Sequence, residues 1–376
     1  MNYNKTWPCL LSFLPIFLFL TPILPAQTNN DYLEISLLTC ESGNALYSTF
    51  GHSALRVIDK KNKKDVVFDY GNFDFDTPFF AFQFLRGSLD YHLGVTNFVD
   101  FQNAYRRMKR SVTEQTFNLP IAAKKEVYQI LLTNYQPENR NYKYDFLKDN
   151  CATRIRDIID KLTIEKVDSV TTITYRSQLK TYLSKKPWLA LGIDVLLGAT
   201  VDKSITTNQL MFLPNSLKEQ LNNYKIAGRN LLNPPKIVVP SKNVNTPLLF
   251  IFQPLFYATF LLLLSIFLFF KAPVFLSKIA NLLFISLGLS GLLLLFLWFG
   301  TRHEATQMNY NLLWLNPLYL IFPFLGKASI KKRFLKMTIL INCCCLLFWV
   351  LIPQIFNIVF IPLIGVVLLV AFVKAK

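Results

Sequence analysis

Two side chains of this sequence are suited to thiol chemistry, and the first is that of Cys151. It follows Asp149 and Asn150, either of which can cap a helix, so the thiol is expected in the first turn of a helix. Partial positive charge there stabilises a thiolate, the form that attacks carbonyl carbon, and backbone N–H groups can stabilise an oxyanion. The alternative is a small core residue, but the helix start and a partner histidine favour a nucleophile.

The second side chain is that of His52, the best candidate for a general base among the three histidines of the chain. It lies on a predicted strand over residues 51–58, which would hold its ring rigidly, and Gly51 lets a neighbouring segment approach closely. A structural histidine is the alternative. We assign that role to His92, which lies within another predicted strand.

A catalytic imidazole needs a group that orients it. A lysine-rich turn and a second strand, over residues 65–70, follow the strand of His52, so a hairpin is predicted. The residues opposite His52 then fall near Asp69, the first candidate, and Tyr70, the second. The choice depends on the register, because a slip of one residue moves a side chain to the other face of the sheet.

The elements that would position these residues form an α+β domain. Ile155, Ile158, Ile159 and Leu162 recur at helical spacing after Cys151, which turns the sulfur toward the buried face of its helix and toward a sheet. Alternating apolar residues and turn signals predict further strands, and helical composition predicts further helices. The predicted strands are 32–38, 51–58, 65–70, 88–93 and 109–117, and the other helices are 121–132 and 187–197.

The composition indicates a membrane protein. The chain has 376 residues, of which 52% are hydrophobic, and the apolar excess lies at the N-terminus and after residue 247. The N-terminal run has a basic start and a small residue near its end, as in a secretory signal, with an uncleaved anchor as the alternative. The sequence therefore predicts a signal peptide at 1–26, an exported catalytic domain at 27–230, a linker at 231–247 and an all-α transmembrane domain at 248–376.

Part of the net charge of +17 comes from basic residues that the predicted membrane topology places in the cytoplasm. Lysines and arginines gather in two short loops of the transmembrane domain and at the C-terminus, and five spans would place all three groups in the cytoplasm. The third span is short, so a tilted or partly re-entrant segment is its alternative. The five predicted spans are 248–270, 276–300, 312–325, 334–352 and 354–373.

Several classes of partner are not expected. The histidines and cysteines lack ligand spacing and no nucleotide-binding glycine loop occurs, so we expect no metal and no cofactor. An exported, membrane-attached domain is a poor partner for nucleic acid, and its basic residues 106–110 suit a solvated strand edge or anionic lipid headgroups. Of the six cysteines only Cys40 and Cys151 fall in the exported domain, and a disulfide between them stays an open question.

A strand histidine followed much later by Asn-Cys at a helix start resembles the circularly permuted papain-like enzymes of the lecithin retinol acyltransferase group, which move acyl chains through a cysteine thioester. More specifically, the chain resembles the Lnb family of bacterial lipoprotein N-acyltransferases, which have an N-terminal periplasmic domain and a C-terminal membrane domain. The likeness spans nearly the whole chain. The segments that carry it are residues 39–43, 50–56, 69–75, 142–154 and 211–214.

The resemblance implies a multi-pass protein of the bacterial inner membrane with a permuted papain-like catalytic domain in the periplasm. It implies that Cys151 takes an acyl chain from a phospholipid and passes it to the free α-amino group of a diacylglyceryl lipoprotein. His52 would deprotonate the thiol and then assist the amine, and Asp69 would orient His52. The permuted group often uses a second histidine as the orienting residue, and none occurs in the equivalent strand here, which leaves the third catalytic residue open.

Four more residues are expected to bind substrate or to support the site. Asn150, Tyr70 and Arg154 neighbour the catalytic candidates in sequence. His303 lies in the loop after the second span, on the same side as the exported domain, where it could meet a phosphate. Interfacial anchoring of that loop by its aromatic residues is the alternative.

Two other functions compete with acyl transfer. A cysteine peptidase or amidase acting on cell-wall peptides would use the same thiol and imidazole, because that chemistry also cleaves amides. It does not require five spans. A binding module attached to a membrane scaffold is the third interpretation, and it would need neither Cys151 nor His52.

Overall fold

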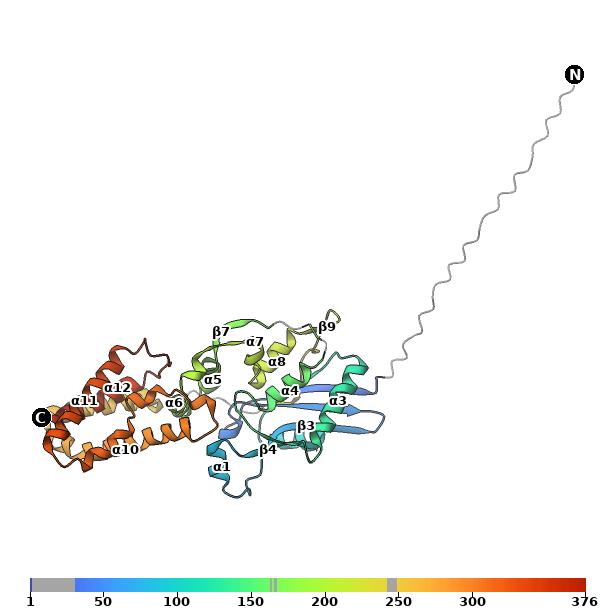
Figure 1. Cartoon of the computed structure of the whole chain (residues 1–376). Helices are drawn as coiled ribbons and strands as arrows, with labels where there is room; N and C mark the ends of the chain where they lie inside the picture. Colours follow the sequence, from blue (N-terminus) through green and yellow to red (C-terminus); the bar gives the residue numbers. More distant parts are fainter. Residues whose placement is uncertain (2–30, 163, 166–167, 242–248) are drawn as a thin grey trace. The chain divides into compact units, whose positions relative to one another are not determined.

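The computed structural model describes residues 1, 31–162, 164–165, 168–241 and 249–376. Nearly all of the predicted signal peptide therefore lies outside the described residues. From residue 32 onward the chain begins with an α+β region and continues into a helical region, residues 254–375 (Figure 1). The prediction of an α+β domain followed by an all-α one is confirmed.

A seven-stranded antiparallel sheet is the frame of the α+β region. Its order is β11-β5-β1-β2-β3-β4-β6, so β1 and β2 lie near the centre. The register between β1 and β2 pairs Cys40 with His52 at one end of the sheet. The strands are β1 Leu33–Cys40, β2 His52–Asp59, β3 Lys64–Asn72, β4 Asp90–Asn97, β5 Val112–Thr116, β6 Asn141–Lys143 and β11 Lys236–Val239.

Helices cover both faces of this sheet. On one face α3, Ile121–Tyr135, and α4, Cys151–Ile159, pack on alternate residues of the strands, such as Leu37, Leu55 and Phe68. On the other face α2, Phe98–Arg107, packs on the residues between them, such as Leu38, Ala54 and Val67. Successive side chains of each strand point to opposite faces of the sheet, so alternate residues belong to two separate apolar clusters.

The sheet continues past residue 230, the predicted end of the catalytic domain. Residues 236–239 of the predicted linker form β11, which pairs with β5. The remaining elements of the region are α1 Phe80–Arg86, β7 Val170–Thr174, α5 Tyr175–Leu183, α6 Pro187–Leu196, β8 Ser204–Thr206, α7 Thr207–Leu210, α8 Pro214–Asn222, β9 Lys225–Ile226 and β10 Arg229–Asn230, with short 3-10 helices at η1 Leu46–Ser48 and η2 Ala199–Asp202.

Two of the described helices are long and apolar enough to cross a membrane, α9, Pro254–Lys271, and α10, Pro273–Phe299. The helix α11, Ala328–Leu347, carries four cations in its first half, and α12, Phe360–Ala375, has only 16 residues. The short 3-10 helices in and before this region are η3 Phe250–Phe252, η4 Glu304–Thr306, η5 Tyr310–Leu313 and η6 Pro317–Phe324.

The prediction of a third transmembrane helix over 312–325 is wrong. The chain there forms η5 and η6, separated by a short turn. Pro317 begins η6 and Pro323 lies inside it, and a proline has no N–H to donate to a helical hydrogen bond. At about 2 Å per residue, eight residues of 3-10 helix extend roughly 16 Å, about half of a bilayer core.

This irregular segment nevertheless runs along most of α10. The positions of Gly291, Gly288 and Phe284 on α10 contact Leu315, Leu320 and Phe322 in turn, so the two segments are antiparallel. An added Cβ at Gly291 would lie 2.0 Å from the Leu315 carbonyl oxygen, which shows how closely the two backbones approach.

Successive segments of the helical region run in alternating directions. Leu262 of α9 meets Gly365 of α12 and Phe269 meets Phe372, so these two helices are parallel, while α11 returns between η6 and α12. At one end Lys374 Nζ donates to the Ser277 carbonyl oxygen at 3.1 Å. The C-terminal lysines therefore lie beside the loop between α9 and α10.

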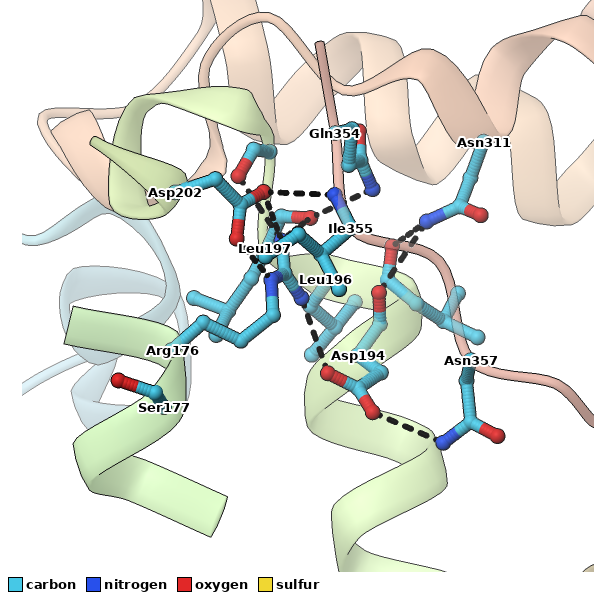
Figure 2. Close-up of polar contacts among 12 residues, drawn as sticks. Arg176, Ser177, Asp194, Leu196, Leu197, Asp202, Asn311, Gln354, Ile355 and Asn357 are labelled. Carbon is cyan, nitrogen blue, oxygen red and sulfur yellow. Dashed lines mark hydrogen bonds and ion pairs between the residues drawn. The ribbon is translucent and has the colours of Figure 1, made fainter. Parts of the chain in front are cut away.

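A buried polar network joins the α+β region to the other end of the helical region (Figure 2). Arg176 of α5 donates from Nη1 to Asp194 Oδ1 at 2.9 Å and from Nε to Asp202 Oδ1 at 2.6 Å. From the helical region, Asn357 Nδ2 donates to Asp194 Oδ2 at 2.8 Å and the Ile355 N–H to Asp202 Oδ2 at 3.1 Å. Each buried carboxylate thus receives donors from both regions.

Candidate functional site

Cys151 is the first residue of α4, and Asn150 is its N-cap. The Asn150 side-chain oxygen accepts hydrogen bonds from the N–H groups of Ala152 and Thr153 at 2.8 and 3.1 Å, and Thr153 bonds back to the Asn150 N–H. The thiol is partly buried and packs against the cluster under α4. The sequence-based placement of Cys151 in the first turn, facing the sheet, is confirmed.

Asn150 also fixes the position of the helix start. Its side-chain Nδ2 donates to the carbonyl oxygens of Phe146 and Phe212, at 2.7 and 3.0 Å. The Asn150 side chain therefore uses both its oxygen and its nitrogen to fix the helix start that carries Cys151. Among the described residues, no acceptor binds the Cys151 N–H.

His52 begins β2 and lies beside Cys151. The charges of its ring and of the Cys151 thiol act on each other, and the Ser53 N–H acts on the same sulfur. Gly51 makes this turn into the strand possible. Its φ is +79°, and an added Cβ would lie 2.7 Å from the Cys40 carbonyl oxygen, so a larger residue would be both strained and crowded.

Asp69 of β3 bonds the far side of the His52 ring, through its Oδ1 and the ring Nε2. This leaves Nδ1 as the nitrogen for the thiol. The register between β2 and β3 pairs Leu55 with Phe68, so Asp69 lies across from Ala54 and shares a face with His52. Tyr70 lies on the other face within the core, and its hydroxyl accepts a hydrogen bond from Asn134 Nδ2 at 2.8 Å. The structure therefore brings together Cys151, His52 and Asp69, while Tyr70 supports the core.

The charges in this group are coupled. Burial favours a neutral ring, yet the charges of Asp69 and Cys151 raise the pKa of His52 well above its ordinary value. Burial also favours a neutral thiol, yet the neighbouring His52 charge and hydrogen bond, with the Ser53 N–H, lower the pKa of Cys151 below 9.0. The pair is thus biased toward thiolate and imidazolium, the reactive form of a cysteine nucleophile.

Tyr142 is a site residue that the sequence reasoning did not single out. Its hydroxyl is buried and has no hydrogen-bond partner among the described residues. It lies 3.9 Å from the position of an added Cβ on Gly71, near the end of β3, and the charge of Cys151 acts on it. Burial raises the pKa of Tyr142, so its hydroxyl keeps its proton and can donate it. A buried donor that has no acceptor among the described residues, and on which the charge of Cys151 acts, is a candidate oxyanion ligand.

Arg154 holds this tyrosine in place. Its guanidinium lies 4.1 Å from the centre of the Tyr142 ring and forms a bidentate ion pair with Asp149. The carboxylate satisfies Nε and Nη2 of the arginine, so Arg154 packs and orients its neighbours.

Three other candidates lie apart from the thiol or cannot react like it. His303 is in the loop after α10, where its Nε2 lies 3.3 Å from the Phe84 carbonyl oxygen. His92 pairs with Asn141 of β6, at the far side of β3 from β2. Cys40 is a free cysteine like Cys151, and burial raises its pKa to about 11, so it stays a protonated thiol.

The arrangement can perform acyl chemistry through a thioester. It holds a thiol, an imidazole, a carboxylate and two hydrogen-bond donors without acceptors among the described residues, the Tyr142 hydroxyl and the Cys151 N–H, which are the groups that this chemistry requires. Among the residues that the structure describes, no group of three or more His, Cys, Asp and Glu side chains could hold a metal ion.

Comparison with known proteins gives two matches that agree with each other. Residues 22–181 match the family model described as the Lnb N-terminal periplasmic domain, and residues 243–375 match the one described as the Lnb transmembrane domain. No curated protein and no solved structure matches the chain. The two family matches lie in the order, and on the two regions, that the fold shows.

Proposed function

The chain belongs to the Lnb family, and from this premise we propose that it is an acyltransferase that moves a fatty acyl chain from a phospholipid to the N-terminal amine of a diacylglyceryl lipoprotein. The observation that carries the proposal is the group of Cys151, His52 and Asp69 at the start of α4. It occurs in a membrane protein with a periplasmic domain, which is consistent with lipid-linked substrates.

In the first half-reaction the Cys151 thiolate attacks the ester carbonyl carbon of the phospholipid. Tyr142 and the Cys151 N–H stabilise the oxyanion that forms on the carbonyl oxygen. As the C–O bond breaks, the leaving alkoxide takes the proton of the His52 imidazolium. The products are a lysophospholipid and a thioester on Cys151, and His52 is neutral.

In the second half-reaction the free α-amino group of the lipoprotein attacks the thioester carbonyl. His52 takes a proton from the attacking nitrogen, the C–S bond breaks, and the amide forms. The thiolate and the imidazolium are restored. Asp69 keeps the ring oriented through both steps, and it is the proposed third catalytic residue in place of the second histidine of the permuted papain-like enzymes.

We further propose that the helical region crosses the inner membrane five times, with the irregular segment 310–325 as the third crossing. The alternating directions of the five segments support this topology. So does the position of the C-terminal lysines beside the loop after α9, since a cytoplasmic end should gather the positive charge.

The test uses the full chain in lipid nanodiscs with isotope-labelled phospholipid and a diacylglyceryl lipopeptide that has a free N-terminus. Mass spectrometry should detect the labelled acyl group first on Cys151 and then on the peptide amine. Tyr142→Phe should slow the first step by about 10²- to 10³-fold, the usual effect of one oxyanion donor.

Cys343→Ala, which removes an exposed cysteine of α11, is the matched control and should retain full activity. Cys151→Ala should abolish both products. N-acylated lipopeptide formed by Cys151→Ala would contradict the proposal. Release of fragments from cell-wall peptides without lipid would instead support the cysteine amidase.

A further inference from the structure

The helix α1 presents large apolar side chains to the surrounding medium. None of its residues is buried, and Phe79, Phe82 and Phe84 are 83%, 53% and 52% exposed. We call Phe75, Phe79, Phe82, Phe84 and Leu85 the aromatic face. So many exposed aromatic side chains in one short segment indicate a surface that another apolar phase covers.

The backbone adds to this observation. Phe79, the N-cap of α1, has a φ of +55°, a left-handed conformation that is unfavourable for a bulky residue. The fold thus holds its most exposed phenylalanine of this segment in a strained conformation, at a position where it covers no core. The strained conformation keeps the Phe79 ring exposed, where it can enter lipid.

Contacts with the helical region place α1 at the end of α10. The Arg302 N–H donates to the Arg86 carbonyl oxygen at 3.0 Å, and an added Cβ at Gly87 would lie 3.0 Å from the His303 ring. The last residues of α10, Trp298 and Phe299, are stacked aromatic side chains with ring centroids 5.0 Å apart. Aromatic residues at the end of a spanning helix mark the membrane interface.

The charge at this junction also suits a lipid surface. The exposed side chains of Arg86 and Arg302 belong to two segments joined by that backbone hydrogen bond, so two cations lie beside the aromatic face. Arginine binds the phosphate of a headgroup while apolar neighbours enter the acyl region.

A row of aromatic rings leads from α1 to the nucleophile. Phe80 lies 5.8 Å from Phe73, Phe73 lies 5.1 Å from Tyr91, and Tyr91 stacks on Tyr144 at 4.4 Å between ring centroids. Tyr144 is close enough to Cys151 for the charge of the thiolate to act on it. The ring contacts therefore connect α1, through the buried Tyr91, to Tyr144, on which the charge of Cys151 acts.

We propose that the aromatic face inserts into the outer leaflet of the membrane, and that an acyl chain of a bilayer phospholipid lies along the row of rings to reach Cys151. The insertion rests on the proposed topology, and the use of the acyl chain rests on the proposed acyl transfer. Insertion lets the enzyme take its donor from the bilayer without drawing the whole lipid into water.

The experiment uses the full chain in nanodiscs of phosphatidylethanolamine and phosphatidylglycerol that contain a phospholipid with a diazirine in its acyl chain. After illumination, peptide mapping should find lipid attached to residues 75–85. In Phe79→Asn/Phe82→Ser, where asparagine tolerates the left-handed φ, this labelling should fall by about tenfold or more.

The same double variant is then acylated at Cys151 by two donors, the bilayer phospholipid and a water-soluble short-chain ester. The rate with the phospholipid should fall about tenfold relative to the rate with the ester. Tyr135→Ser/Val170→Ser, at two exposed apolar positions on α3 and β7, is the control and should leave both the labelling and the ratio unchanged.

An unlabelled aromatic face, or an unchanged ratio in the double variant, would overturn the inference even if acyl transfer is real. If neither donor acylates Cys151, the proposed function fails. In that case the photolabelling still decides whether α1 enters the membrane.

Discussion

At the scale of single residues, the charge of Asp69 favours the charged form of His52, whose charge in turn favours the Cys151 thiolate. Asp69→Asn keeps the shape of the side chain but removes the charge that raises the pKa of His52. The Asp69 charge by itself raises the thiol pKa slightly, but the opposing His52 charge is the larger influence. The variant should therefore have a Cys151 pKa that moves upward, toward the ordinary 9.0.

This shift can be measured as the pH dependence of iodoacetamide labelling at the Cys151 peptide. A thiolate reacts and a thiol does not, so the rate rises as the pH rises through the thiol pKa. In the parent chain the midpoint should lie below 9.0, and in Asp69→Asn at a higher pH than in the parent. Asp90→Asn, an exposed carboxylate on β4, should leave the midpoint in place. Identical midpoints for Asp69→Asn and the parent would exclude the coupling.

Some residues of the site could be predicted from the sequence and others could not. Cys151 and His52 follow from residue type and local pattern, because a cap and a strand are local features. Asp69 could be named only together with Tyr70, since the register that separates their faces depends on pairing across the hairpin. Tyr142 could not be predicted, because its proposed role rests on a hydroxyl without a partner among the described residues, which depends on what surrounds it in the folded chain.

At the scale of elements, the network around Arg176 ties α5 and α6 to the helical region. Its side chain and those of Asp194 and Asp202 are 1%, 6% and 4% exposed, so its loss leaves two buried carboxylates without their cation. Arg176→Ala should lower the free energy of unfolding by about 3–5 kcal/mol. Lys60→Ala, which removes an exposed pair with Glu34, should cost less than about 1 kcal/mol.

The measurement is the Tm of the full chain in detergent micelles, followed for both variants under the same conditions. Arg176→Ala should melt several degrees lower than Lys60→Ala. Equal melting temperatures for the two variants would mean that the network adds no more stability than an exposed ion pair.

The two errors in the predicted elements have different causes. Residues 312–325 are apolar enough for a span, but two prolines prevent a regular helix, and a composition window does not weigh them. Residues 236–239 have the prolines of a linker around them, yet they complete the sheet through pairing with β5, more than 100 residues earlier in the chain. The first outcome thus follows from local prolines, and the second depends on a strand that is distant in sequence.

At the scale of the whole chain, the two family matches leave residues 182–242 between them. This interval contains α6 and the carboxylates of the Arg176 network, so it is the segment that joins the two regions. The apolar side of α6 contributes to a cluster of the helical region and to one of the α+β region. A part of the chain outside both matches thus contacts both regions.

The proposed topology depends on whether the irregular segment 310–325 crosses the membrane. If it does, Val350, between α11 and α12, faces the periplasm and Ala328, at the start of α11, faces the cytoplasm. Val350→Cys should then react with a membrane-impermeant maleimide in intact cells. Ala328→Cys should react only after permeabilisation, and the parent chain gives the background from its own cysteines. If the segment enters and leaves on one side, Ala328→Cys reacts in intact cells, and the positive charge at the start of α11 would lie outside, against the usual distribution.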